Sequence, residues 1–510
     1  MMVTRRRAGI SGTVATAVAL GVGELLSGIF DGVPSPLSAI GAWVVAVSPS
    51  GVTKWAIRVF GTADKLVLGI GTGIIALIIG WFAGRFAVRR FAAGAAVFVG
   101  FGLLGIVAGL GEPLISPAGT LIAGVVAAGA GIWSLRVLLN AAAEPDAPTD
   151  GVVADPTRRR FVAVAGAGVA FATVAGGVGR SLLGRAVVPA PVGVPPVTTT
   201  PRSALIADGH DFDEAGLTPI VLPDEGIDFY RIDTALVVPR VDATTWQMRI
   251  AGLVDRDVAL TYEDLLAMDH IDRYVTIACV SNEVGGDLVG NALWTGPRLS
   301  EVLDRAGVRP EATQLVGRSV DGWTAGFPTE AAFDDREAMI ALYMNGEPLP
   351  RRHGYPARLI VPGLYGYVSA TKWLAEIELT RWESFDAYWI PRGWSKVGPI
   401  KLQSRIDTPR NGERVTAGSV VAAGVAWAPT IGIDAVEIRI DDGPWLATET
   451  SIPLADAAWV QWRTAVDLAS GGHRLEVRAT DANGMVQTDE RRSPAPNGAS
   501  GHHRVMVTAA

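Results

Sequence analysis

The chain changes its hydrophobic pattern after about residue 180. Before that point, apolar stretches of about 20 residues recur, and each is long enough to cross ~30 Å of hydrocarbon as a helix. These stretches lie at about residues 8–30, 66–84, 91–111 and 118–139. We therefore predict a membrane domain of about four helices over residues 1–140, followed by a globular part.

A shorter apolar run extends from Leu37 to Val47 and is interrupted by Ser48-Pro49-Ser50-Gly51. Because this run is too short to span a bilayer, it is predicted to be interfacial or re-entrant. The alternative is that it pairs with Val52 to Phe60 as a poor span.

Basic residues indicate the orientation of the helices. They precede the first stretch, lie between the second and third, and close the fourth: Arg5, Arg6, Arg7, Arg85, Arg89, Arg90 and Arg136. By the positive-inside rule, the N-terminus and the end of the fourth helix are cytoplasmic. Residues 141–157, in which Pro and Asp oppose regular structure, then form a cytoplasmic linker.

A fifth apolar helix is predicted over residues 158–182. It opens with Arg158-Arg159-Arg160 and resembles the twin-arginine signal that exports folded, cofactor-loaded domains. The alternative is an ordinary membrane helix with a basic flank. Both interpretations place the following domain outside a multi-pass plasma-membrane anchor, with membrane lipid as a partner. Residues 183–218, rich in Pro and Thr, are predicted to form an extended tether.

Composition narrows the classes of partner and site. The net charge is −7 and no long basic run alternates with aromatic residues, so nucleic acid is not an expected partner. The single Cys excludes an intrachain disulfide and any Cys-cluster zinc or iron–sulfur site. No His lies in the apolar stretches, whose acidic neighbours are Glu24 and Glu112, so these helices are expected to carry no haem. His502 and His503 are predicted to lie in a solvated loop.

The globular part shows two patterns of secondary structure. Residues 219–398 alternate β-type runs with short helices, which predicts a mixed α+β domain. Its expected strands are 245–250, 274–278, 358–361 and 372–379, and its expected helices are 262–268, capped by Thr261, and 300–306. Residues 399–510 carry only short strands separated by turns, which predicts an immunoglobulin-like β-sandwich. The clearest of these strands are 420–427, 436–440, 460–463 and 473–479.

The only Cys lies where a predicted strand enters a Gly-rich loop. Cys279 follows the β-branched run 274–278 and precedes Ser281, Asn282 and the pair Gly285-Gly286. A soft thiolate in such a loop suits a thiophilic metal. Taken alone, however, a lone Cys is more often a small buried hydrophobic residue.

Two further segments carry candidate chemistry. Residues 344–374 combine Gly-rich turns with His353, Arg358 and Lys372, an arrangement that suits a phosphate-bearing cofactor. The alternative is a surface hairpin with scattered charge. Residues 229–233 (FYRID) form an aromatic and basic stretch, whose alternative interpretation is a core aromatic beside a solvated Arg.

Together these segments resemble the sulfite oxidase family of molybdopterin enzymes, in its membrane-anchored bacterial branch. The run from Asn345-Gly346 to Trp373-Leu374 carries the most specific motif, and Cys279 matches the metal-ligating Cys of the family. The resemblance covers about residues 220–510 and implies that residues 219–398 are a molybdopterin-binding catalytic domain. It also implies that residues 399–510 are a dimerisation-type domain through which a homodimer would form.

The resemblance implies a molybdenum–molybdopterin cofactor, with Cys279 as a metal ligand and no haem. It assigns catalytic roles to Cys279, Tyr230 and Arg231. The residues that it implies for cofactor binding are Phe229, Tyr230, Cys279, Ser281, Asn282, His353, Arg358, Ser369, Thr371 and Lys372.

The chain departs from the sulfite-oxidising pattern at three places. Glu283 and Val284 follow Asn282, where the family has two Arg, one of which faces the anionic substrate. Pro391 stands where the family has a Tyr before a Lys-Gly-aromatic triplet, and one extra residue precedes Lys372. We therefore expect two-electron oxygen-atom transfer on a small substrate other than sulfite.

Two further functions fit parts of the pattern. One is an S-oxide reductase that is fed by a membrane electron donor, and no residue in the sequence decides the direction of electron flow. The other is a non-catalytic, membrane-anchored receptor or adhesion protein with a β-sandwich, which explains the domain layout but not the motif at residues 345–374.

Overall fold

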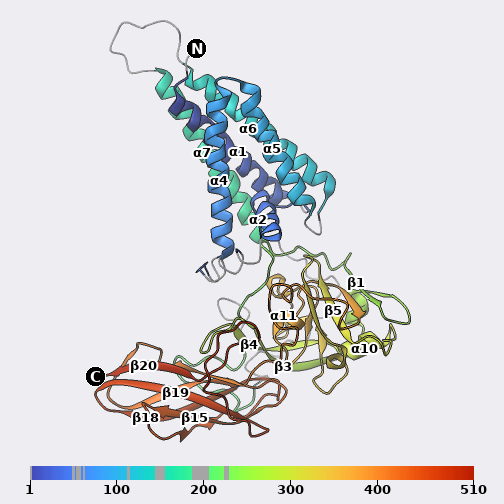
Figure 1. Cartoon of the computed structure of the whole chain (residues 1–510), viewed down its shortest axis with the longest axis vertical. Helices are drawn as coiled ribbons and strands as arrows, with labels where there is room; N and C mark the ends of the chain where they lie inside the picture. The colour runs from blue at the N-terminus through green and yellow to red at the C-terminus, as the bar shows by residue number, and fades with distance from the viewer. Residues whose placement is uncertain are drawn as a thin grey trace. The chain divides into compact units, whose positions relative to one another are not determined.

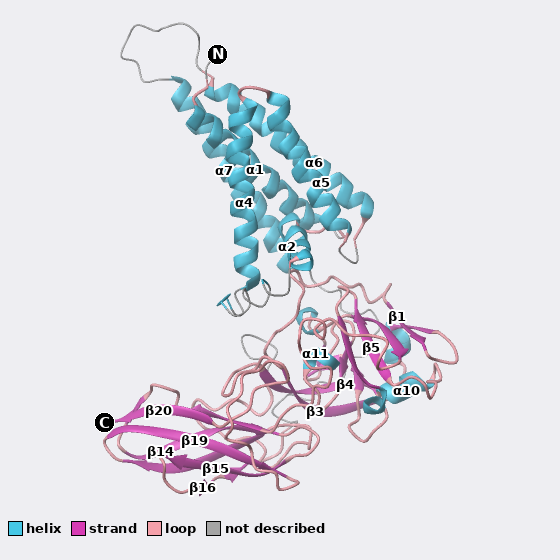
Figure 2. Ribbon diagram, in the orientation of Figure 1, coloured by secondary structure: helices cyan, strands magenta, loops and turns pink. Residues whose placement is uncertain are grey.

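The computed structural model describes residues 3–30, 32–48, 52, 59–60, 64–111, 115–143, 156–185, 206–222 and 229–510. The chain forms two compact units, one of Met1–Val188 with Ala235–Arg240 and one of Pro189–Thr234 with Val241–Ala510. Most of the predicted linker 141–157 and tether 183–218, as well as Glu112, lies outside the described residues. The first unit is helical and the second is built mainly of strands (Figures 1 and 2).

Within its described residues, the first unit has five helices that are long and apolar enough to cross a membrane. They confirm the lengths expected from the apolar stretches: α1 (Arg5–Ile29), α4 (Asp64–Ala87), α5 (Phe91–Leu110), α6 (Pro117–Ala142) and α7 (Pro156–Arg185). The short apolar run forms a sixth helix, α2 (Pro36–Val47). Its predicted interfacial or re-entrant position stays a prediction.

Small residues bring these helices close together. A Cβ on Gly12 of α1 would overlap the Gly80 carbonyl of α4, and a Cβ on Gly179 of α7 would overlap the Glu24 carbonyl of α1. Glycine at such positions lets apolar helices pack at short distance without a large buried side chain between them. Phe98 and Leu135, both fully buried, fill the remaining core of the bundle.

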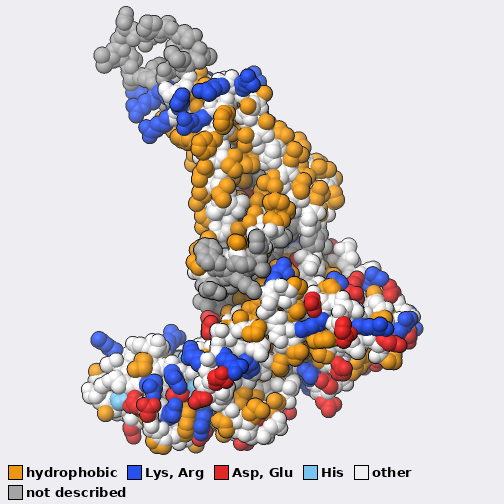
Figure 3. All heavy atoms as spheres, viewed as in Figure 1, with side chains coloured by type: hydrophobic (Ala, Val, Ile, Leu, Met, Phe, Trp, Pro, Cys, Tyr) orange, Lys and Arg blue, Asp and Glu red, His pale blue; other side chains and the backbone are white. Residues whose placement is uncertain are grey.

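Basic side chains gather at the end of the bundle where α1 begins (Figure 3). The helices place them there because α1, α5 and α7 start at this end while α4 and α6 finish at it. Exposed apolar side chains cover the length of the helices instead, among them Leu66, Ile74, Leu103, Val125 and Phe171. The bundle is therefore polar and cationic at one end and apolar along its sides.

One acidic residue is buried inside the bundle. Glu24 is 3% exposed, and its carboxylate accepts a hydrogen bond from the Ser35 hydroxyl at 2.6 Å. Its other oxygen lies 2.9 Å from Nε of Arg180. Since Ser35 caps α2 and Arg180 belongs to α7, this carboxylate ties three helices together.

Two sheets form the α+β part of the second unit. The first has the order β2-β1-β11-β5-β6 and the second the order β3-β4-β8-β9. Strand β1 pairs in parallel with β11, so the first and last strands of this part are neighbours. The strands are β1 (Gln247–Gly252), β2 (Val258–Thr261), β3 (His270–Ala278), β4 (Val289–Pro297), β5 (Gln314–Ser319), β6 (Thr324–Pro328), β8 (Tyr343–Met344), β9 (Glu347–Pro348) and β11 (Leu374–Thr380).

Short helices and a small ribbon complete this part. Helix α9 (Tyr262–Leu266) begins with the predicted Thr261 cap, whose hydroxyl and Asp264 form a reciprocal capping box. The other elements are β7 (Met339–Ala341), which pairs with β10 (Arg358–Ile360), α10 (Leu299–Asp304), the 3₁₀ turn η3 (Arg351–His353) and α11 (Gly366–Ser369). The mixed α+β prediction is confirmed in these elements.

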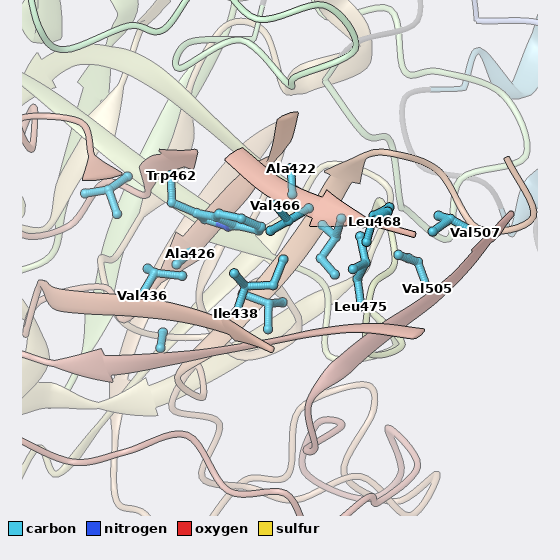
Figure 4. Packing of buried hydrophobic residues seen from close by; sticks show 14 of the residues in the cluster. Ala422, Ala426, Val436, Ile438, Trp462, Val466, Leu468, Leu475, Val505 and Val507 are labelled. Carbon is cyan, nitrogen blue, oxygen red and sulfur yellow. The ribbon is translucent and has the colours of Figure 1, made fainter. Parts of the chain in front are cut away.

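The C-terminal part contains two sheets around one apolar core (Figure 4). Trp462, Ile438 and Val477 are fully buried between them. One sheet has β12 (Gln403–Thr408), β14 (Gly418–Trp427), β18 (Val460–Leu468) and β17 (Glu449–Thr450); the other has β13 (Arg414–Val415), β20 (His503–Ala509), β19 (Gly471–Asp481), β15 (Ile433–Ile440) and β16 (Leu446–Ala447). The expected strands are present, and the immunoglobulin-like topology stays a prediction.

Two predictions of local structure were wrong. His502 is not in a solvated loop: it is 6% exposed, and its Nδ1 lies 2.8 Å from the buried Glu476 carboxylate. His503 opens strand β20, whose alternating buried positions were missed. The strand expected from Lys372 begins at Leu374, because Trp373 has φ +50° and cannot continue an extended strand.

Candidate active site

Strand β3 delivers Cys279 to a buried position. The last four residues of β3 are buried, and the amide of Cys279 donates to the Leu288 carbonyl at 2.9 Å. The thiol lies 2.9 Å from the Ser281 hydroxyl. Burial raises the pKa of the Cys279 thiol, and the hydrogen bond with Ser281 opposes that rise. A positive group or a metal is therefore needed to keep this sulfur as a thiolate.

Phe229 and Tyr230 bring an aromatic wall to the site. Their rings stack with centroids 5.5 Å apart. The Phe229 ring also makes T-shaped contacts with Trp294 and His353, at centroid distances of 5.7 and 5.5 Å. Burial raises the pKa of Tyr230, and the nearby Cys279 charge raises it further while Arg358 lowers it. Tyr230 thus presents a neutral hydroxyl within electrostatic range of both Cys279 and Arg358.

Arg358, the first residue of β10, is a buried cation. It is 4% exposed, lies over the Trp294 ring at 4.9 Å, and donates from Nη1 to the His353 carbonyl at 3.0 Å. Burial lowers its pKa to about 10. Among the described residues, its Nε has no hydrogen-bond partner. A buried guanidinium N–H without an acceptor is costly, so an anionic ligand would satisfy it.

The His353-Gly354 pair of the motif has a structural reason. Gly354 follows the η3 turn with φ +117°, a conformation that residues with a Cβ rarely adopt. It also lies against the side chains of Arg358 and Lys372. Glycine here lets the two cations approach the turn that carries His353, which is 2% exposed.

A second group of charges surrounds Asp233. Lys372 Nζ donates to its Oδ2 at 2.6 Å, and Arg231 Nε donates to the same oxygen at 2.9 Å. Lys372 also lies over the Trp373 ring at 4.6 Å. Burial lowers the pKa of Lys372 to about 8, and Asp233 opposes that shift. Adjacent in sequence, Tyr230 and Arg231 thus have different neighbours. Tyr230 interacts with Cys279 and Arg358, whereas Arg231 binds Asp233.

The remaining predicted residues make mainly local contacts. The Asn282 side-chain oxygen accepts from the Leu288 amide at 2.9 Å and closes the loop after Cys279. The Ser369 hydroxyl donates to the Tyr365 carbonyl at 3.1 Å, and the Thr371 hydroxyl to the Gly317 carbonyl at 3.4 Å. Both hydroxyls are bonded to backbone, so their predicted contact with a cofactor stays a prediction.

The sequence interpretation missed three residues of the site. Trp294 stands in the wholly buried strand β4, whose sequence gives no sign of its role under Arg358. Asp233 ends the stretch 229–233, and an acid two residues after Arg231 is the local sequence signal for their ion pair. Tyr365 caps α11, and burial raises its pKa to about 12, with the Cys279 charge adding to the rise. It brings a second phenol within electrostatic range of Cys279.

Comparisons with known proteins place this site in a family. Human mitochondrial sulfite oxidase is 29% identical over 303 residues, which cover 50% of this chain and 55% of that protein. A model described as an oxidoreductase molybdopterin binding domain matches residues 235–389. The uncharacterized oxidoreductase YuiH of Bacillus subtilis is 32% identical over 188 residues, which cover 36% of this chain and 90% of that protein. The chain belongs to the sulfite oxidase family of molybdopterin-dependent oxidoreductases.

This sulfite oxidase family member is thus an oxidoreductase that binds a molybdenum–molybdopterin cofactor. It spans about half the length of human sulfite oxidase. Among solved structures, the sulfane dehydrogenase SoxCD from Paracoccus pantotrophus has a TM-score of 0.47 and 24% identity, covering 53% of this chain and 80% of that chain. The family assignment leaves the non-catalytic receptor without support.

The site residues fit a cofactor of this type. Cys279 offers one soft donor at the end of a rigid strand, as a molybdenum ligand requires. The Nε of Arg358, which has no partner in the described part of the chain, and the cation Lys372 offer donors to a phosphate. Phe229, Trp294 and His353 supply flat surfaces beside Arg358.

Proposed function

We propose that this protein is a membrane-anchored, extracytoplasmic molybdenum–pterin oxidoreductase that transfers an oxygen atom to or from a small substrate of low charge. The observation that carries the proposal is that the buried Tyr230 hydroxyl lies within electrostatic range of both the Cys279 thiol and the Arg358 guanidinium, whose own contacts join it to Trp294 and His353. These groups offer a metal ligand, a neutral proton donor and a cation in one buried region.

Each residue then has a distinct task. Cys279 would ligate the metal, while Arg358, His353 and Lys372 would hold the phosphate of the pterin. The bound cofactor would supply two-electron chemistry and accept or donate the oxygen atom. Tyr230 would donate a hydrogen bond to the transferred oxygen, because its raised pKa keeps the proton on the phenol. The buried aromatic wall would limit access of water.

The charge balance supports a substrate other than a dianion. Arg231 and Lys372 are both bonded to Asp233, so these three side chains together contribute one net positive charge. Arg358 adds a second, and a pterin phosphate would neutralise roughly one to two charges. These four side chains then leave little positive charge for a substrate such as sulfite. Glu283, in the position of a family Arg, adds negative charge to the exposed surface of the Cys279 loop.

The basic end of the helical bundle supports the orientation. Lys and Arg gather where α1 begins, and cytoplasmic ends of membrane helices carry such an excess. α7 starts at this end, so its last residues would emerge on the opposite, extracytoplasmic side. The twin-arginine interpretation of Arg158-Arg159-Arg160 agrees with export of a folded, cofactor-loaded domain. A membrane electron donor or acceptor would complete the reaction, and the C-terminal part would join two copies.

Metal and pterin analysis of the detergent-solubilised protein tests the first claim. We expect about one molybdenum and one pterin per chain, and a chain without molybdenum would contradict the proposal. Substrate choice is tested with sulfite, dimethyl sulfoxide, methionine sulfoxide and nitrate, using artificial electron donors and acceptors. We expect the uncharged S-oxides to give the highest kcat/KM, and a preference for sulfite would overturn the charge argument.

A further inference from the structure

The segment Cys279–Leu288, here termed the cysteine loop, is closed by its own hydrogen bonds. Cys279 donates from its amide to the Leu288 carbonyl, and Leu288 donates from its amide to Asn282 at 2.9 Å. The Asn282 amide donates to the Cys279 carbonyl at 3.0 Å. These bonds fix the inner side of the loop, next to the thiol. At its outer turn the Gly286 amide donates to the Glu283 carbonyl at 2.9 Å, while Gly285 and the Gly286 carbonyl contact the C-terminal part.

The imidazole ring of His503, in the C-terminal part, covers that outer turn. Gly285 has φ +80°, and a Cβ built on it would overlap the imidazole of His503. His503 is the first residue of β20, and its Nδ1 accepts a hydrogen bond from the Ile406 amide at 2.9 Å. The ring is therefore fixed by its own domain before it meets the loop.

A second residue of the C-terminal part, Arg405, binds the carbonyl of Gly286. Arg405, 8% exposed in β12, donates from Nη1 to the Gly286 carbonyl at 2.9 Å. Its Nε is held by Asp407 at 2.6 Å and its Nη2 by the Thr218 hydroxyl at 2.9 Å. All three guanidinium nitrogens are thus in use, which makes Arg405 a rigid support rather than a free charge.

We propose that His503 and Arg405 are positioning residues for Cys279: by holding the outer turn of the cysteine loop, they keep the thiol in the place that the metal requires. The proposal rests on the proposed role of Cys279 as ligand. Neither residue is placed at the reacting atoms, and both act through Gly285 and Gly286. Supports of this kind orient ligands, and their loss costs metal affinity or activity even when the ligand itself is intact.

The rate of thiol labelling tests the proposal, because Cys279 is the only Cys in the sequence. Full-length, cofactor-free protein in detergent is treated with iodoacetamide. In His503→Asn, the side-chain oxygen can still accept from Ile406, but the ring over Gly285 is gone. We expect labelling at least about tenfold faster than in the natural chain, since tenfold equals about 1.4 kcal/mol of easier loop opening. Arg405→Gln, which breaks the Gly286 bond, should act in the same direction.

Two further variants separate positioning from general stability. His503→Phe keeps a ring over Gly285 but loses the Ile406 bond, so it should restore slow labelling. His502→Asn alters the adjacent buried residue, whose ring binds Glu476 and the Gln487 carbonyl instead, and it should label at the natural rate. Thermal unfolding of each variant shows whether the domain stays folded.

The outcomes are distinct. Natural labelling rates in both His503→Asn and Arg405→Gln would overturn the proposal. Equal acceleration in His503→Phe, His503→Asn and His502→Asn would also overturn it, because general softening of the domain would then explain the result. Metal analysis of the natural protein is independent: a chain without molybdenum would refute the proposed function, whereas the labelling result would still report how the loop is held.

Discussion

Arg358 and Lys372 both pack against Gly354: a Cβ on this glycine would stand 3.1 Å from the Arg358 Cβ and 3.0 Å from the Lys372 Cβ. Both distances are tighter than ordinary van der Waals contact, and the positive φ adds strain for any residue with a side chain. We therefore predict that Gly354→Ala pushes the two cations apart. Expected effects are a loss of about 1–3 kcal/mol in stability and a lower pterin content per chain. Gly346→Ala is the matched control, because Gly346 also has positive φ (+84°) but no atom within 4 Å of its Cβ position.

Cys279→Ser should abolish turnover while leaving the fold intact. The substitution changes one atom at a buried site, yet a hydroxyl is a poor ligand for a thiophilic metal. We expect kcat to fall at least about 100-fold, or roughly 2.7 kcal/mol, with an unchanged circular dichroism spectrum. Much of the pterin should remain bound, which fluorescence of the released pterin measures. Full activity in this variant would remove Cys279 from the metal.

Asp233→Asn should make the site more attractive to anions. The change removes the acceptor charge that Arg231 and Lys372 share, so the site gains about one positive charge. We expect sulfite to bind about fivefold more tightly at low salt, which corresponds to an attraction on the order of 1 kcal/mol. The gain should shrink as salt is added, and binding of dimethyl sulfoxide should not change. Asp257→Asn, at the exposed pair with Arg249, controls for surface charge.

Tyr365→Phe tests whether the phenol near Cys279 takes part in the reaction. Removing one hydroxyl keeps the buried ring, so the thermal unfolding temperature should shift little. If the hydroxyl donates a hydrogen bond during catalysis, kcat should fall about 10- to 100-fold with little change in KM. Tyr367→Phe, two residues along the same segment, is the control because its hydroxyl donates to the Ser395 carbonyl. Equal kinetics for the natural chain and Tyr365→Phe would exclude a catalytic role.

His503 should make the stability of the C-terminal part depend on pH. Burial and the neighbouring Arg405 lower its pKa to about 4, from an ordinary value of 6.5. The unfolded chain therefore binds this proton more readily than the folded chain between these two pH values, so stability is complete above pH 6.5 and falls as the pH drops towards 4. The largest effect is about 3 kcal/mol. Unfolding temperatures measured at pH 5 and pH 7 should differ less in His503→Asn than in the natural chain.

The sequence predicted elements whose signals are local. Thr261 followed by Asp264 marks the start of α9, and apolar stretches of sufficient length mark α1 and α4–α7. It also supplied most of the site, since Cys279, His353 and Arg358 stand in short motifs. The sequence did not predict residues whose role depends on contacts with segments far away in the chain. The Trp294 ring under Arg358 and the Asp233 carboxylate on Lys372 depend on packing between segments far apart in the chain.

His502 and His503 show why such contacts escape a sequence pattern. Two adjacent His near a chain end usually indicate a solvated segment. Here His502 binds Glu476, which is buried on the neighbouring strand β19, and His503 binds the Ile406 amide on β12. Neither partner can be predicted from the residues next to the two His. Apolar and polar residues do alternate along β20, from His503 to Ala509, but its polar first residues made the strand hard to recognise.

The parallel pairing of β1 with β11 has a consequence for biosynthesis. Arg249 lies opposite Glu376, so the sheet stays open until more than 120 further residues have left the ribosome. Strand β3, which carries Cys279 at its end, also needs Ala457 and Trp459 as hydrogen-bond partners for Thr276. Contacts this remote in sequence form slowly and late. The N-terminal helices will therefore have been synthesised well before the cofactor site exists, and the cofactor can enter only a nearly finished chain.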